Sequence, residues 1–272
     1  MPPQPLRVGS VPYLVGRPLD LGLENEPGIE LVRDVPARLV EGLRSGDLDV
    51  ALVSSIELFR RPGYRYLPAV AVAGRGTVAS VQVFLRKPLD QVRTIALDPS
   101  SRTAATLVRV LLAARPDGGP DFLEVAPGED PRDAEADGWL RIGDPALREA
   151  WAANAPKLWN PSRAWTERTG LPFVFAPWIV RPGVEIEPHL AAFARSRLVG
   201  ARRIGELAAR AAREWDLPVG PCTTYLAEEC VYEPGPQMHA ALTAFRDAAA
   251  PLGLCDGRLD PRPVEAFLAH RG

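Results

Sequence analysis

The chain has 272 residues, enough for one large domain or for two lobes of ordinary size. Its hydrophobic fraction of 46% and charged fraction of 24% are typical of a soluble globular protein. The formal net charge of −2 excludes an electrostatic basis for binding nucleic acid or an anionic membrane, so any attraction for an anionic ligand has to be local.

Residues 6–60 show a regular alternation of strand-like and helix-like segments. Strands are predicted at 6–11, 29–33 and 49–53 from their apolar runs. Between them, Val35, Leu39 and Leu43 recur every four residues, the stripe of a helix that ends near Gly46, and short helices are predicted to begin at Pro18 and after Ser54. This β-α-β-α-β-α order predicts a parallel sheet.

A second set of strands and helices follows. Strands are predicted at 67–73, 78–86, 94–97, 122–125, 139–142 and 157–160, with helices at 101–114, from Pro145 and at 161–170. The long apolar run at 172–180 is predicted to cross back between lobes. Helical spacing then predicts helices at 187–199, 202–215, 223–231, 238–249 and 261–269.

These elements predict an α/β protein with two hinged lobes. Residues 1–87 and 180–272 are expected to form the first, discontinuous lobe, and residues 88–179 the second. In hinged folds of this kind the ligand lies in a cleft between the lobes, and the connecting segments close over it.

Several of the predicted strands end in clusters of Ser, Thr or Gly, and some of these clusters begin a helix. Unpaired N–H groups and the helix dipole at such a point favour an anion, and ligands of open α/β sheets lie beyond the carboxyl ends of the strands. We therefore expect the cleft to bind a small carboxylate. The candidate binding residues are Ser54, Ser55, Ser80, Val81, Ser101, Arg102, Thr103, Gly143 and Asp144.

Each candidate also has a purely structural interpretation. One of Ser54 and Ser55 is enough to cap the following helix, which leaves the other for a ligand. Ser80, inside a predicted strand, faces either water or the cleft, and Arg102 contributes charge-assisted hydrogen bonds only if it turns inward. Asp144 either accepts a hydrogen bond from a ligand hydroxyl or only caps a helix, and capping is favoured because a carboxylate repels an anion.

The reactive side chains form no recognisable catalytic or metal-binding arrangement. The three cysteines, Cys222, Cys230 and Cys255, form no CxxC pair, and the three histidines are far apart in the sequence. There is no Ser/His/Asp pattern, P-loop or GxGxxG. Residues 1–10 do not resemble a signal peptide and no apolar run approaches ~18 residues, so we expect a cytoplasmic protein with reduced thiols and no membrane span.

At the same turns the sequence resembles the chorismate dehydratase family of the futalosine route to menaquinone. The resemblance is carried in order by Arg7-Val-Gly-Ser-Val-Pro-Tyr-Leu14 with Pro18-Leu19, Gly46-Asp-Leu-Asp-Val-Ala-Leu-Val-Ser-Ser-Ile56, Ala79-Ser-Val-Gln-Val-Phe84, Ile95-Ala-Leu-Asp-Pro-Ser-Ser-Arg-Thr103, Leu140-Arg-Ile-Gly-Asp-Pro-Ala-Leu147 and residues 165–176. It implies a type II periplasmic-binding-protein-like fold in a cytoplasmic lyase without metal or other cofactor. The implied reaction removes water from chorismate, a dicarboxylate, to give 3-[(1-carboxyvinyl)oxy]benzoate.

One position departs from the family's first motif, which usually has asparagine after Tyr-Leu. Here that position is Val15, which neither accepts a proton nor hydrogen-bonds through its side chain. Either the reaction does not need that group, or Arg17 or a nearby hydroxyl replaces it, or the activity is altered. The catalytic residue stays unassigned. Our hypothesis is that the substrate's enolpyruvyl carboxylate, or a water held by a hydroxyl, takes the proton.

Three other functions compete with the lyase. A non-catalytic solute-binding protein for a small carboxylate shares the fold and cleft but needs export or an anchor. The effector-sensing part of a transcription regulator needs a helix-turn-helix, which the sequence does not show. A later enzyme of the same route fits the motifs less well than the dehydratase. The sequence predicts no oligomeric state.

Overall fold

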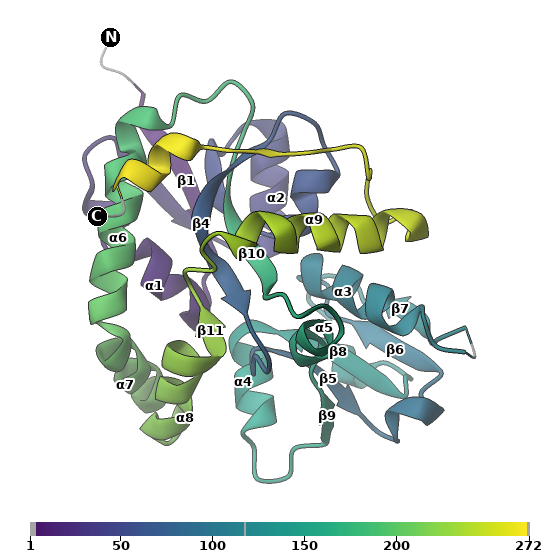
Figure 1. Ribbon diagram of the computed structural model, residues 1–272. Coiled ribbons are helices and arrows are strands. Elements are labelled where there is room, and N and C mark those ends of the chain that lie inside the picture. The colour runs from purple at the N-terminus through teal and green to yellow at the C-terminus, as the bar shows by residue number, and fades with distance from the viewer. Residues whose placement is uncertain (1–3, 117, 271–272) are drawn as a thin grey trace.

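The computed structural model of the protein describes residues 4–116 and 118–270. It contains two sheets, one above the other in Figure 1. The seven-stranded sheet has the order β11-β4-β10-β3-β1-β2, with β12 paired to β4, and the five-stranded sheet has the order β7-β6-β8-β5-β9.

The seven-stranded sheet is built from both ends of the chain. Its strands are β1 (Leu6–Ser10), β2 (Ile29–Arg33), β3 (Val50–Leu52), β4 (Arg65–Gly74), β10 (Phe173–Val180), β11 (Cys230–Val231) and β12 (Arg262–Pro263). The helices in the same parts of the chain are α1 (Arg17–Asp20), α2 (Pro36–Ser45), α6 (Leu190–Arg202), α7 (Ile204–Trp215), α8 (Val219–Thr224) and α9 (Gln237–Ala249). As predicted, β1 pairs in parallel with β2 and β3.

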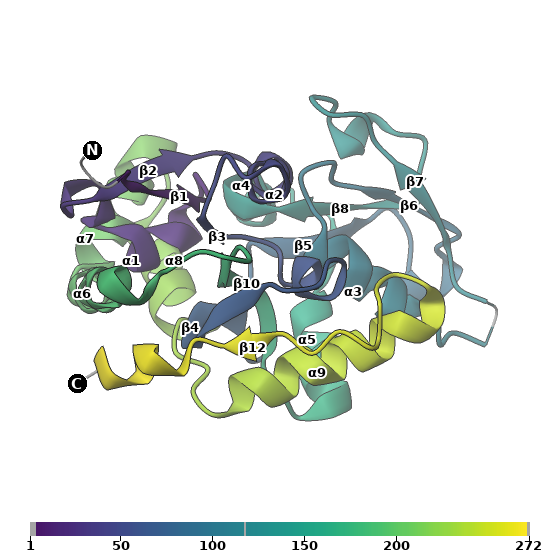
Figure 2. The ribbon, with the colours of Figure 1, turned by 90° about the horizontal axis from the view of Figure 1, so that it is seen from above.

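The five-stranded sheet comes from the middle of the chain. Its strands are β5 (Val81–Leu85), β6 (Thr94–Leu97), β7 (Asp121–Glu124), β8 (Gly138–Ile142) and β9 (Lys157–Trp159), with helices α3 (Thr103–Leu112), α4 (Gly143–Ala150) and α5 (Pro161–Thr169). Strand β6 is parallel to β7 and β8, whereas β5 is antiparallel to β8 and β9. Figure 2 shows the two sheets beside each other from above.

The chain changes sheets at residues 75–80, between β4 and β5, and at residues 160–172, between β9 and β10. The expected lobe boundaries at 87 and 180 do not coincide with these points, because β5 pairs in the second sheet and β10 in the first. An apolar run alone does not reveal the sheet that a strand joins. We therefore propose that the lobes exchange at the two connections.

Helix ends follow from residue type. Helix α2 buries the predicted stripe through Leu39, Val40 and Leu43, and it ends at Gly46, whose φ of 87° suits glycine. Helix α5 ends in the same way at Gly170, with φ 70°. These two helices are close to their predicted bounds.

Two predictions in the C-terminal third were wrong. Residues 225–229 form a π-helical turn (η7, Tyr225–Glu229) and residues 230–231 a strand, so the helix expected at 223–231 is interrupted. The helix expected at 261–269 is replaced by β12 and the 3-10 helix η9 (Glu265–His270). In both segments, pairing with β4 competes with helix formation.

Buried apolar side chains connect the two lobes. One cluster contains Val8 and Trp178 from the first sheet together with Val83 and Leu140 from the second. The lobes are therefore in contact. No helix in the described ranges is long and apolar enough to cross a membrane.

Candidate active site

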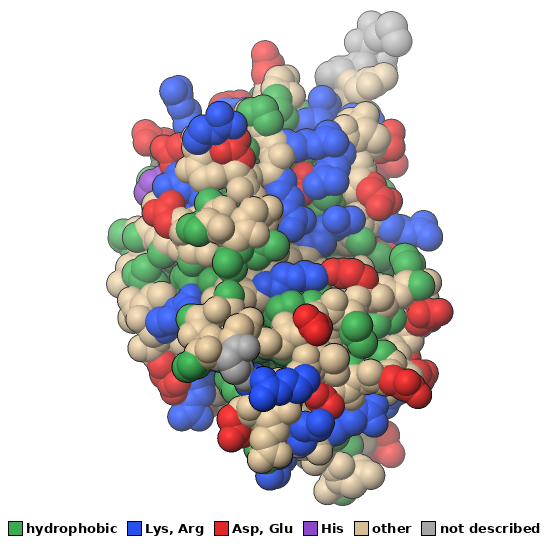
Figure 3. Space-filling view, turned by 90° about the vertical axis from the view of Figure 1, so that its right-hand side faces the viewer, with side chains coloured by type: hydrophobic (Ala, Val, Ile, Leu, Met, Phe, Trp, Pro, Cys, Tyr) green, Lys and Arg blue, Asp and Glu red, His purple; other side chains and the backbone are tan. Residues whose placement is uncertain are grey.

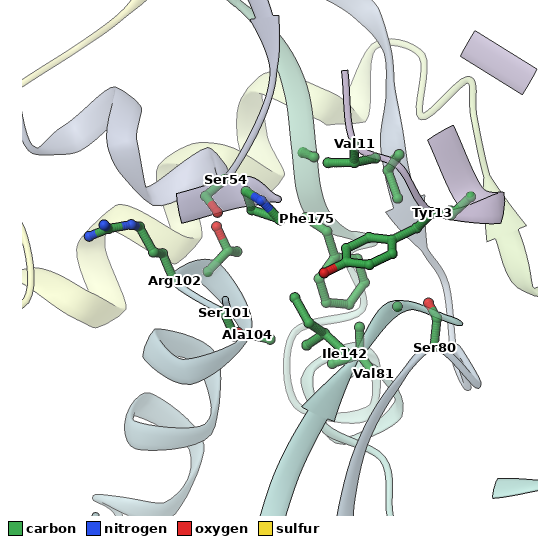
Figure 4. A pocket seen from close by; sticks show the side chains of 16 residues that line it. Val11, Tyr13, Ser54, Ser80, Val81, Ser101, Arg102, Ala104, Ile142 and Phe175 are labelled. Atoms are coloured by element: carbon green, nitrogen blue, oxygen red, sulfur yellow. The ribbon is translucent and has the colours of Figure 1, made fainter. Parts of the chain in front are cut away.

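A cavity lies between the two lobes (Figure 4). It contains about 580 Å³ of space free of protein atoms, including its open mouth. Its walls come from both sheets and are mainly apolar. The lining residues are Val11, Tyr13, Val15, Pro36, Ser54, Val72, Ser80, Val81, Ser101, Arg102, Thr103, Ala104, Ile142, Gly143, Phe175 and Ala176.

Most of the predicted binding residues meet at this cavity. Those that line it are Ser54, Ser80, Val81, Ser101, Arg102, Thr103 and Gly143. Ser55 and Asp144 lie outside it and join the lobes instead, as described below. The hydroxyl groups that line the cavity come from the first lobe (Ser54), the second lobe (Ser101, Thr103) and the connection between them (Ser80).

Ser54 and Ser55 divide their tasks. Ser54 follows β3 and precedes the 3-10 helix η3 (Ser55–Phe59), yet within the described residues its side chain makes no capping hydrogen bond. Its hydroxyl is thus available to a ligand. Ser55 Oγ lies 3.5 Å from Thr103 Oγ1, which also accepts from the Ile56 N–H at 3.3 Å. Ser55 therefore connects β3 to the start of α3 across the cleft.

The turn at residues 98–102 is fixed from within. The Asp98 carboxylate accepts from the Ser100 N–H at 2.9 Å and from the Ile142 N–H at 3.1 Å, which ties the ends of β6 and β8 together. Ser101 Oγ accepts from the Ala105 N–H at 3.2 Å. The start of α3 therefore faces the cavity with a rigid backbone and the positive end of its dipole.

Arg102 is, among residues 4–116 and 118–270, the only cationic side chain that lines the cavity. Its guanidinium points away from the middle of the cavity in Figure 4 and lies 3.9 Å from the exposed carboxylate of Glu41 on α2. Its Nε is buried and has no hydrogen-bond partner in the described part of the chain. An ion pair at this distance with an exposed carboxylate is weak, so little holds the Arg102 guanidinium in place.

Positive charge is unevenly distributed over the molecule. Lys and Arg side chains form a cluster in the upper part of the face in Figure 3, and others lie among Asp and Glu side chains in its lower half, although the formal net charge is −2. Local attraction for an anion is therefore compatible with the overall charge.

Ser80 lies in a turn and not in a strand, which corrects the prediction. It precedes β5, which begins at Val81. Its carbonyl accepts from the Gly143 N–H at 2.8 Å. The neighbouring Ala79 N–H donates to Glu229 Oε2 at 2.7 Å, and the Asn160 amide donates to Val78 and Val81 carbonyls. The backbone under the Ser80 hydroxyl is therefore held from several sides.

Asp144 does not cap α4, contrary to the expectation. The N-cap residue of α4 is Ile142, and Asp144 Oδ1 accepts from the Leu14 N–H at 2.9 Å in the opposite lobe. Burial raises the pKa of Asp144 to about 6, although the Leu14 N–H and the nearby Arg148 and Arg17 favour the charged form. This contact links the lobes next to the cavity.

Tyr13 is the main cavity residue that the sequence prediction missed. Its hydroxyl points into the middle of the cavity in Figure 4 and lies 3.5 Å from Ser100 Oγ, and burial raises its pKa. Its ring packs on Gly143, where a Cβ would lie 2.7 Å from the ring and where φ is 68°. Tyr13 belongs to the first stretch of the family resemblance, and this was the feature of the sequence from which its place at the cavity could have been predicted. Val15 lines the same cavity.

The arrangement can bind a flat, partly apolar anion. Phe175, Ile142 and Val81 provide an apolar wall for a ring, whereas Ser54, Ser101 and the start of α3 provide donors for carboxylates. Among the described residues no group of three or more His, Cys, Asp or Glu side chains is placed to hold a metal ion.

Comparison with known proteins gives consistent results. Residues 6–251 match the model of a family described as "Menaquinone biosynthesis". The chain is 33% identical to the chorismate dehydratase of Thermus thermophilus over 230 residues, covering 77% of this chain and 83% of that protein. It is 29% identical to the chorismate dehydratase of Campylobacter jejuni over 175 residues, covering 62% of this chain and 64% of that protein.

The fold is also found in solved structures. The alkanesulfonate-binding protein SsuA from Xanthomonas axonopodis superposes with a TM-score of 0.65 at 17% identity, covering 95% of this chain and 96% of that chain. The two-lobed fold of periplasmic binding proteins, predicted from the sequence, is thereby confirmed. The family match covers most of the chain, and the chain belongs to the menaquinone biosynthesis family.

Proposed function

We propose that this protein is a chorismate dehydratase, which converts chorismate to 3-[(1-carboxyvinyl)oxy]benzoate and water for menaquinone biosynthesis. The main support is the cavity between the lobes, which is lined by the predicted hydroxyls of Ser54, Ser80 and Ser101 and by an apolar wall. The two relatives named above bear the name of this activity.

The two carboxylates of chorismate have separate anchors in this proposal. The start of α3, with Ser101, Thr103 and Arg102, binds one carboxylate through N–H groups, hydroxyls and a guanidinium that swings from Glu41 into the cavity. Ser54 lies beside this group in Figure 4 and donates to the same carboxylate, whereas Ser80, on the opposite side of the cavity, donates to the other. Ser55 and Asp144 keep the lobes together and have no direct contact with substrate.

The reaction itself needs a proton acceptor and a leaving group. One C–H bond and the neighbouring C–O bond of the ring break, a ring double bond forms, and the hydroxyl leaves as water. Aromatisation makes this step strongly downhill, so positioning and exclusion of water are the main tasks of the protein. Of the titratable side chains, Tyr13 and Arg102 line the cavity within the described ranges, and neither is a carboxylate or an imidazole. The substrate's enolpyruvyl carboxylate, or a water held by a hydroxyl, therefore takes the proton.

Val15 fits this assignment. It adds to the apolar wall near Tyr13, whose hydroxyl remains available to orient the substrate. Val15 itself cannot take part in proton transfer, so the valine costs the proposed mechanism an orienting contact and not its base.

The test is to mix purified protein with chorismate and follow the ultraviolet spectrum and the product mass. The proposal predicts a benzoate-type spectrum and a product lighter than chorismate by one water, with no cofactor added. Unchanged chorismate after long incubation with folded protein would reject the activity.

A solute-binding protein is the second candidate, because SsuA shares the fold. The same experiment distinguishes the dehydratase from a solute-binding protein, since a binding protein would leave chorismate unchanged and give no product. We propose the cytoplasm as the compartment, which the three free thiols support, as thiols of secreted proteins are usually paired.

A further inference from the structure

The turn that carries Ser80 packs against the π-helical turn η7. This turn is closed by the Cys230 N–H, which donates to the Tyr225 carbonyl. Such turns are rare and occur often at functional sites. Two side chains of η7, four residues apart, reach the same turn: Glu229 accepts from the Ala79 N–H at 2.7 Å, and the Tyr225 hydroxyl is near enough to the Ser80 side chain to interact with it.

The Tyr225 hydroxyl is buried without a complete hydrogen bond. The residue is 1% exposed, and its ring meets Trp151, at the end of α4, edge-on at 6.3 Å between centroids. The hydroxyl lies against Ser80 and the Cys230 thiol, but it has no hydrogen-bond partner of full geometry among the described residues. An unpaired buried hydroxyl lowers stability, so its presence at this position calls for another reason.

The hydrogen-bonding capacity of the Ser80 hydroxyl suggests a reason for the unpaired Tyr225 hydroxyl. A serine hydroxyl has one proton to donate and two lone pairs that accept. Its backbone is fixed by the Gly143 N–H and by the bond at Ala79, so the remaining freedom is rotation about the Cα–Cβ and Cβ–Oγ bonds of the side chain. A donor behind the Ser80 oxygen would leave only the cavity side for the serine proton.

We propose that Tyr225 is a positioning residue, whose hydroxyl donates to Ser80 Oγ when substrate fills the cavity and so directs the Ser80 proton at a substrate carboxylate. This inference rests on the function proposed above. Hydrogen bonds in a chain polarise one another, so the tyrosine strengthens a contact that it does not make itself. Burial raises the pKa of Tyr225 well above its ordinary value, so the hydroxyl keeps its proton at physiological pH.

The test compares Tyr225→Phe with Tyr232→Phe. Tyr232 is a matched control, because it is also buried, its hydroxyl also lacks a partner among the described residues, and it also adjoins Cys230. We expect Tyr225→Phe to raise the KM for chorismate, and the calorimetric Kd for the product or for unconverted chorismate, about fivefold to tenfold, the effect of one hydrogen bond. Tyr232→Phe should change both less than about twofold, and both variants should melt no lower than the parent protein.

A double-mutant cycle with Ser80→Ala decides whether Tyr225 acts through Ser80. Once the serine hydroxyl is gone, Tyr225→Phe should cause no further loss. An equal loss in the Ser80→Ala background, an equal effect of Tyr232→Phe, or an unchanged Kd for Tyr225→Phe would each overturn the inference. If the parent protein binds chorismate without converting it, the proposed activity is wrong. The Kd values of the parent protein and the two variants then still test the role of Tyr225. If the parent protein does not bind chorismate, both proposals fall.

Discussion

At the scale of single residues, Arg102 and Ser101 are the proposed anchors of one substrate carboxylate. Replacing both by alanine removes a charge-assisted hydrogen bond from the guanidinium and a hydroxyl donor to the same carboxylate, and one such bond contributes about 1.5–3 kcal/mol. We expect Ser101→Ala with Arg102→Ala to raise the KM for chorismate at least about tenfold. Steady-state kinetics measures this, with exposed Arg38 of α2 as the control. If the double variant keeps the KM of the parent protein, this pair does not belong to the site.

Gly143 gives a second prediction at this scale. Its φ of 68° disfavours any Cβ by about 1–2 kcal/mol, and a Cβ would also meet the Tyr13 ring at 2.7 Å. Gly170 has φ 70° with open space around it, so Gly170→Ala isolates the backbone cost. We expect Gly143→Ala to lower both melting temperature and kcat/KM, and Gly170→Ala to lower the melting temperature alone. Equal activity in the two variants would show that Tyr13 does not need this contact.

The sequence predicted site residues only where local pattern determines them. Ser54 and Ser101 follow strand ends, and their place at the cavity follows from the architecture. Tyr13 is on a loop whose direction depends on packing against Gly143, which is 130 residues away. Asp144 was assigned a capping role because a carboxylate repels an anion, and its actual partner, the Leu14 N–H, lies in the other lobe. Long-range contacts of this kind leave no local signal.

At the scale of elements, η7 supports the turn before β5. Glu229→Ala leaves the part-buried Ala79 N–H without its acceptor, which should destabilise the protein by about 1–3 kcal/mol. Since this turn carries Ser80, the KM for chorismate should rise as well. Thermal melting and kinetics test this, and the adjacent, exposed Glu228→Ala is the control. Indistinguishable melting curves for the two variants would contradict the supporting role.

Element types were predicted best where the pattern was long. Strand β2 and strand β6 match their predicted bounds, and α2 follows its apolar stripe. The segment at 225–231 was wrong because its residues have helical spacing, while the edge of β4 offers Cys230 and Val231 a strand partner. Tertiary pairing there outweighs local preference.

At the scale of the whole molecule, the Asp144 contact makes the association of the lobes dependent on pH. Because burial raises the pKa of Asp144 to about 6, the folded protein holds a proton there that the unfolded chain releases near its ordinary value of 3.8. The contribution of this group to stability is therefore complete below about pH 4 and falls as pH rises through about 6.

Asp144→Asn keeps an acceptor for the Leu14 N–H and removes this titration. Relative to the variant, the parent protein should lose about 1–3 kcal/mol of unfolding free energy between pH 4 and 7. Denaturant unfolding at several pH values measures the difference. The nearby charged groups Arg148, Arg17 and Glu214 are present in both proteins, so the difference between them reports Asp144. Parallel pH profiles of the unfolding free energy would mean that Asp144 titrates normally.

The division into lobes was only partly readable from the sequence. Two α/β units joined by extended segments were predicted, and two sheets are present. The strand at 81–85 was assigned to the first lobe because the pattern breaks only after it, at residues 87–89, yet it pairs with β8 and β9. Both arrangements bury the same apolar run, so hydrophobic pattern does not distinguish them.

The most direct test of the account is a crystal structure of the protein with 3-[(1-carboxyvinyl)oxy]benzoate bound. We predict that the product lies between the lobes, with its ring against Phe175 and its carboxylates on the hydroxyls of Ser54, Ser80 and Ser101. Product bound elsewhere would show that the cleft between the lobes is not the substrate site, and product in this cavity with those three hydroxyls turned away from it would contradict their role.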